Sequence, residues 1–181
     1  MGVQTTQSTC RLLTLVGGVS TLLSYAWMVW VAPNRTAVQD TTGGLLQVGT
    51  WARAAWTTST FIATVALTIG LGMLCFDSDV RVQTWNDINL ALLLFFGGAA
   101  SWTTVAYHAS LHRLPRWFAA VPVWVTAFGN LLVIAYVEET ALQALWGFGA
   151  FHHIVLDGVI WSQRYIQAPI QPFFSSYVGS V

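Results

Sequence analysis

The side chains in this sequence best suited to hold a metal or to move a proton are four histidines and one aspartate. They fall into two groups, His108 with His112, and His152 with His153 and Asp157. Neutral imidazole is a common metal ligand, and it is also the side chain that most readily exchanges a proton near neutral pH. This grouping is the clearest chemical signal in the chain.

Helical spacing predicts which of these side chains share a face. His108 and His112 are four residues apart and lie on one face if their helix continues past both. His153 and Asp157 are also four apart, whereas His152 points about 100° away from His153. We therefore expect the two pairs, which belong to different helices, to converge at a similar depth.

Convergence would create a metal site with ligands from two helices. The predicted ligands are His108, His112, His153 and Asp157, a set that suits a transition metal. The carboxylate would act either as a direct ligand or as the acceptor that orients an imidazole. Alternatively, no cofactor binds: His153 and Asp157 hydrogen-bond each other and Arg164, and His108 and His112 belong to a basic loop that faces the lipid headgroups.

A flat cofactor is the other form that such a site could take. Haem iron would be held by one histidine from each helix, such as His108 and His153, whereas chlorophyll magnesium would need only one of them. Trp102 and Trp124 would shape the pocket around the ring. The chain has no P-loop, GxSxG, CxxC or HExxH motif, and it contains no lysine that could form a retinal Schiff base. No residue is assigned a catalytic role, and whether the protein is an enzyme stays open.

The elements that must position these residues are long apolar helices. Of the 181 residues, 55% are hydrophobic and only 8% are charged, so water is not the main solvent of this chain. Five apolar runs are each long enough to cross a bilayer at ~1.5 Å per residue. They cover about residues 12–31, 54–76, 88–107, 118–137 and 141–161. We predict an all-α, polytopic integral membrane protein, with a single domain built as a bundle of five transmembrane helices.

The arginines predict the orientation of this bundle. Two lie on the side of the N-terminus, Arg11 and Arg81. Five lie on the opposite side, at positions 35, 53, 113, 116 and 164. By the positive-inside rule the N-terminus is outside and the C-terminus inside, in a membrane that the sequence does not identify. Cys10 and Cys75 then share the outer end of the bundle, and the sequence leaves open whether they pair.

The C-terminal residues 162–181 are aromatic, nearly uncharged and broken by proline, so they do not form another span. We expect this tail to lie on a partner or at the membrane interface. The predicted partners are the lipid bilayer and other membrane subunits, with no nucleic acid.

Two functions fit these observations. The first is a small membrane subunit, or cofactor-holding component, of a larger complex that handles electrons or pigments, as in electron transport or photosynthesis. The second is a compact histidine-ligated metalloenzyme acting on a lipid or an isoprenoid. An enzyme needs a cavity lined by the histidines and Asp157, whereas a subunit needs apolar helix faces that its own chain leaves uncovered.

Overall fold

The computed structural model describes residues 2–46 and 50–167, and this part of the chain is helical almost throughout. The long helices are α1 (Gly2–Ala26), α3 (Thr50–Phe76), α4 (Trp85–Ser110), α5 (Ala120–Tyr136) and α6 (Thr140–Phe151). The shorter ones are η1 (Trp27–Val31), α2 (Arg35–Leu46), η2 (Arg116–Ala119), η3 (His152–Trp161) and α7 (Ser162–Gln167). No β-strand forms within the described ranges.

Four helices in this part of the chain are long and apolar enough to cross a membrane. They are Gln7–Val31, Ala54–Phe76, Trp85–Ser110 and Arg116–Tyr136. These helices coincide with the first four predicted runs. The chain is therefore all-helical and has the features of a multi-pass membrane protein.

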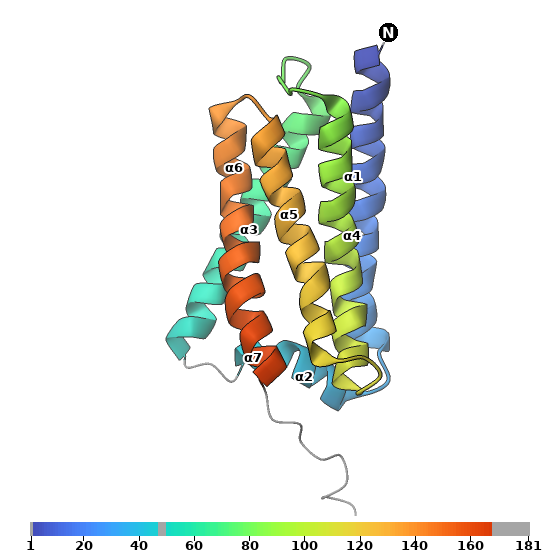
Figure 1. Cartoon of the computed structure of the whole chain (residues 1–181), viewed down its shortest axis with the longest axis vertical. Coiled ribbons are helices and arrows are strands. Elements are labelled where there is room, and N and C mark those ends of the chain that lie inside the picture. The colour runs from blue at the N-terminus through green and yellow to red at the C-terminus, as the bar shows by residue number, and fades with distance from the viewer. Residues whose placement is uncertain (1, 47–49, 168–181) are drawn as a thin grey trace, which may run out of the picture.

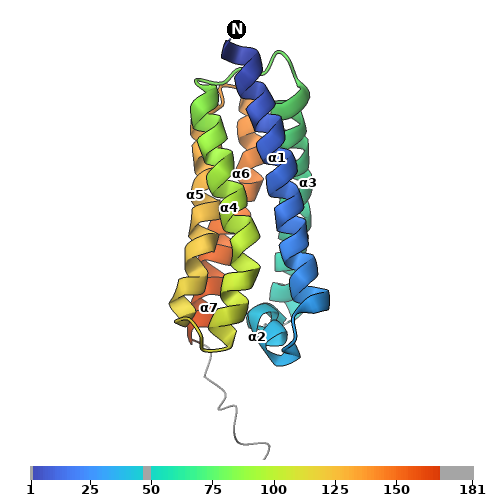
Figure 2. The ribbon, with the colours of Figure 1, turned by 90° about the vertical axis from the view of Figure 1, so that its right-hand side faces the viewer.

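The helices form a ring in which α4 packs against both α1 and α5, and α6 packs against both α5 and α3. Figures 1 and 2 show the long helices running along one common axis, with α2 lying across the end opposite the N-terminus. We refer to these as the α2 end and the N-terminal end of the bundle. Figure 1 also shows the first turns of α3 leaning away from the other helices, at the lower left.

Close backbone contact joins α4 to α5 at two glycines. A Cβ atom on Gly98 would lie 2.5 Å from the carbonyl oxygen of Pro122, and one on Gly129 would lie 2.5 Å from the backbone nitrogen of Phe95. In lipid, where no hydrophobic force pushes helices together, such close approach is what makes packing favourable. A Cβ on Gly97, by contrast, would meet nothing within 4 Å.

Polar contacts hold the α2 end together. The side chain of Asn34 caps α2 by accepting from the backbone of Ala37, at 3.0 Å. From α2, Asp40 forms an ion pair of 2.8 Å with Arg116. Arg116 also donates to the carbonyl oxygen of Tyr165, at 3.0 Å. The hydroxyl of Tyr165 donates to the carbonyl oxygen of Ala106, at 2.8 Å, and so joins α7 to α4.

The fifth predicted run, 141–161, lies within one continuous helical stretch from Thr140 to Gln167, which changes its winding along the way. It begins as α6, becomes the π-helix η3 at His152, and returns to α-helix as α7. In a π-helix the backbone bonds run between residues five apart and each turn is wider, so side chains five apart lie closer together than in an α-helix. That change of register decides the geometry of the site below.

Most of the predicted tail, 168–181, lies outside the described residues. Its first six residues form α7, where Ser162 and Tyr165 are buried against the rest of the chain. Tyr165 stacks on Trp161, with the ring centroids 4.8 Å apart. The start of the tail therefore packs on its own chain.

Candidate functional site

A cavity of about 800 Å³ lies between α1, α3, α4 and η3. Most of its wall is apolar, formed by residues such as Leu67, Leu71, Phe95 and Phe96. Polar side chains also line it, and several of them come from the half nearer α2. They include Tyr25, Trp56, Thr60, Trp102, His152, His153 and Asp157. An apolar cavity of this size with a few convergent polar groups is the usual form of a small-molecule site.

The carboxylate of Asp157 faces His152, at 3.4 Å from Oδ2 to Nε2. The sequence prediction paired Asp157 with His153 instead, and that prediction is wrong. It assumed α-helical winding, in which residues five apart point in different directions, whereas the wider turn of η3 brings His152 and Asp157 closer together. The histidine that contacts Asp157 is thus His152 and not His153.

Three more side chains fix this pair. Trp56 donates from Nε1 to Oδ1 of Asp157, at 3.1 Å, which leaves Oδ2 for the imidazole. On the other side of the ring, Nδ1 of His152 lies 3.1 Å from the hydroxyl of Ser59. The hydroxyl of Thr60 lies 3.5 Å from Nε2. Because a carboxylate only accepts, the Nε2 that faces it carries the proton, and Nδ1 accepts from Ser59.

His153 has a different partner on a different helix. The side-chain amide of Asn130, on α5, donates to Nδ1 of His153 at 2.8 Å. The ring of His153 also packs edge-on against Phe95 of α4, with centroids 5.9 Å apart. His153 therefore lines the cavity from a fixed position, held by hydrogen bonding across helices.

His108 and His112 do not share a helix face, which corrects the second spacing prediction. α4 ends at Ser110, and His112 adopts a left-handed backbone conformation with φ of 57°. Its amide donates to the carbonyl of Ala109, at 3.1 Å, and the amide of Arg113 donates to that of His108, at 3.0 Å. This pair of bonds is a Schellman helix end, which stops the helix before His112.

The two tryptophans predicted as walls of a pocket separate in the structure. Trp102 lines the cavity, and its rings pack near Tyr25 and Trp161 with centroid separations of 5.8 Å and 5.2 Å. Its buried Nε1 donor has no hydrogen-bond partner among the described residues. Trp124 packs against Gly158 instead and is half-exposed, and it does not line this cavity.

The four predicted metal ligands are not gathered into one cluster. Within residues 2–46 and 50–167, no group of three or more His, Cys, Asp or Glu side chains could hold a metal ion. His108 contacts its own helix end, at Tyr107 and Arg113. His153 and Asp157 do both line the cavity.

Two functional candidates, Trp56 and Ser59, were missed by reasoning from the sequence. Both lie on α3, far along the chain from Asp157, and neither occurs in a recognisable motif. A π-helix often marks a functional site, but apolar spacing alone does not reveal one. α-helical spacing directs His152 away from Asp157, so it does not predict the contact between them.

The fold and the cavity define a class, an all-helical membrane-type bundle with a lined cavity between its helices. No protein-family model, no curated protein and no solved structure matches the chain. Its function therefore has to be argued from the geometry itself.

Proposed function

We propose that this protein holds a lipophilic molecule, a ligand or an organic cofactor, inside a membrane bundle of five spans. The observation that carries the proposal is the cavity of about 800 Å³ between α1, α3, α4 and η3. Its apolar wall suits a hydrocarbon or ring body, and the polar groups among its lining residues suit a head with hydrogen-bonding atoms.

The chemistry of the polar residues narrows the class of molecule. The unpaired indole N–H of Trp102 needs an acceptor, such as a carbonyl oxygen of the bound molecule. Oδ2 of Asp157 can accept from a hydroxyl or an N–H of the same molecule. A membrane-soluble compound with both functions, such as an isoprenoid or lipid with an oxygenated head, fits these two residues together.

The length of the last helical stretch and the exposed apolar face of α1 support a place for the bundle in a membrane. α6, η3 and α7 together are as long as a span, and we propose that they form the fifth, with the N-terminus outside and the C-terminus inside. α1 keeps a broad apolar face uncovered, which includes Leu15 and Leu22 at 65% and 72% exposure. Lipid or a further subunit of a complex would cover this face.

The test is to identify what co-purifies with the protein from its native membrane. The purified sample is extracted with organic solvent for mass spectrometry, and its absorption spectrum and metal content are recorded. We expect about one molecule of a single oxygenated lipophilic compound per chain, and a visible band would identify a porphyrin or another pigment. A sample with only bulk lipid and no band would overturn the proposal.

A cavity-filling variant makes this test specific. Ala99→Phe adds a ring to a residue that lines the cavity and should remove the bound compound. Leu93→Phe adds a ring on the same helix at a position that is 57% exposed, and it should keep the compound. Equal retention in both variants would place the bound molecule outside the cavity.

A further inference from the structure

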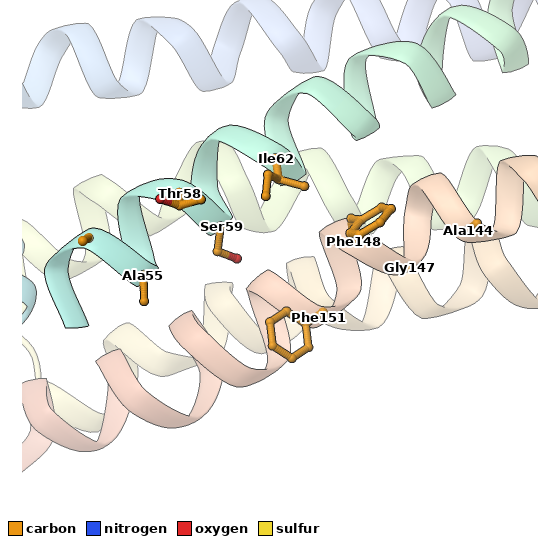
Figure 3. A pocket seen from close by; sticks show the side chains of 9 residues that line it. Ala55, Thr58, Ser59, Ile62, Ala144, Gly147, Phe148 and Phe151 are labelled. Carbon is orange, nitrogen blue, oxygen red and sulfur yellow. The ribbon is translucent and has the colours of Figure 1, made fainter. Parts of the chain in front are cut away.

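The hydrogen bonds around His152 continue out of the cavity to a second hollow. A groove of about 690 Å³ lies between α3 and α6, lined by residues that include Ser59, Ile62, Phe148 and Phe151. Figure 3 shows this groove, with Ser59 on α3 and Phe151 on the facing helix. Ser59 therefore belongs to the groove, while its partner His152 lines the cavity on the other side.

The three side chains form an ordered series. The hydroxyl of Ser59 is 3.1 Å from Nδ1 of His152, and Nε2 of the same ring is 3.4 Å from Oδ2 of Asp157. His152 is buried, with only 5% of its side chain exposed, whereas Ser59 is half-buried at the groove. A nucleophile bonded to a base, which is in turn oriented by an acid, is the arrangement that activates a serine.

A fourth residue orients the acid. Trp56 donates to Oδ1 of Asp157, at 3.1 Å, so the carboxylate is held from its far side. The proton on the imidazole is thereby fixed on Nε2, and Nδ1 faces Ser59 as an acceptor. The assignment of the two ring nitrogens is the reverse of the usual one, and the roles of nucleophile, base and orienting acid are unchanged.

The groove indicates the kind of substrate. Phe148 and Phe151 leave 52% and 56% of their surface exposed beside it, and Ile62 leaves 44%. Ser59 lies on α3 within a candidate membrane span, near the α2 end of the bundle. An acyl chain from the surrounding lipid fits an apolar groove on such a span, with its ester beside Ser59.

From this geometry we infer that Ser59 is a nucleophile for acyl esters of membrane lipids, with His152 as its base and Asp157 as the orienting acid. Oγ of Ser59 forms a bond to the ester carbonyl carbon, and its proton passes to Nδ1 of His152. The bond to the leaving alcohol breaks, and the alcohol takes that proton. Water then attacks the acyl-serine and gives its proton to His152, and the acid is released as Ser59 recovers the proton.

The experiment uses a fluorophosphonate probe with an alkyl chain, on the full-length protein in detergent or nanodiscs. Phosphonylation forms a bond from serine Oγ to phosphorus and releases fluoride, so peptide mass spectrometry locates the reacting residue. We expect labelling at Ser59, and none in Ser59→Ala. Asp157→Asn and His152→Ala should lower the labelling rate about 100-fold or more. Hydrolysis of a p-nitrophenyl fatty-acid ester should fall in parallel.

Controls separate reactivity from folding. Ser101→Ala removes a helix serine whose hydroxyl bonds the backbone carbonyls of Gly97 and Gly98, at 2.6 Å and 3.2 Å, and it should react like the unmodified protein. Ser59→Cys keeps a nucleophile in place, and its thiol should react with an alkyl iodide faster when His152 is present than in the double variant with His152→Ala. Absence of labelling at Ser59 in the folded protein, or equal rates with and without Asp157, would overturn the inference.

Discussion

Asp157 shows how strongly a single half-buried polar residue depends on its neighbours. Its two oxygens have separate partners, the indole of Trp56 and the imidazole of His152. A carboxylate placed among apolar residues is costly unless its oxygens are bonded, so each partner contributes to the stability of the folded bundle.

We expect Trp56→Phe to destabilise the protein by about 0.5 to 2 kcal/mol, the range measured for hydrogen bonds between membrane helices. The ring volume is largely kept, while the donor to Oδ1 of Asp157 is lost. Unfolding in mixed micelles, followed by circular dichroism, measures the change. Trp30→Phe is the matched control, because Trp30 is 75% exposed, and its effect should stay within about 0.5 kcal/mol. Equal losses in both variants would contradict this account.

At the scale of the elements, helix packing depends on two adjacent glycines with opposite surroundings. We expect Gly98→Ala to cost about 1 to 3 kcal/mol, because its Cβ would lie 2.5 Å from a backbone oxygen that cannot move aside. Gly97→Ala meets nothing within 4 Å and should be neutral, or stabilising by up to about 1 kcal/mol through helix propensity. Thermal unfolding of both variants in the same detergent tests this, and similar midpoints would contradict it.

The contact between α1 and α3 provides a second prediction for the elements. Cys10 and Cys75 are free and buried, with their sulfur atoms 3.9 Å apart. Mild oxidation should therefore join α1 to α3 by a disulfide within one chain, after a small side-chain rotation. Peptide mapping under non-reducing conditions detects the link, and Cys10→Ser should abolish it. Recovery of both thiols after oxidation, in the folded protein, would show that the helices are held further apart.

The sequence predicted the elements better than the site. Apolar run length is set by the thickness of the membrane, so four of the five predicted runs coincide with candidate spans. α2 was missed because it is short and lacks such a run. The pairing of His152 with Asp157 was missed because it depends on backbone winding, which side-chain spacing does not report. The end of α4 before His112 was missed because a Schellman end is usually marked by glycine.

At the scale of the whole molecule, the number of spans fixes where the two ends of the chain lie. Figure 1 shows the N-terminus at one end of the bundle and α7 at the other. If α6, η3 and α7 cross the membrane together, the start of α1 and the end of α7 are on opposite sides. If only the four candidate spans cross, the two ends are on the same side. The sides on which the two ends lie therefore show whether the number of spans is odd or even.

We expect the two ends on opposite sides of the membrane, with the N-terminus outside. Five of the seven arginines lie on the side of the bundle opposite the N-terminus, and the positive-inside rule makes that side the inner one. An epitope tag at each terminus, probed with a membrane-impermeant protease on sealed vesicles or cells, distinguishes the arrangements. The N-terminal tag should be cleaved without detergent and the C-terminal tag only with it. Cleavage of both tags, or of neither, would mean an even number of spans. The stretch from α6 to α7 would then not cross the bilayer, and the groove between α3 and α6 that Ser59 lines would not open to lipid as the inferred reaction requires.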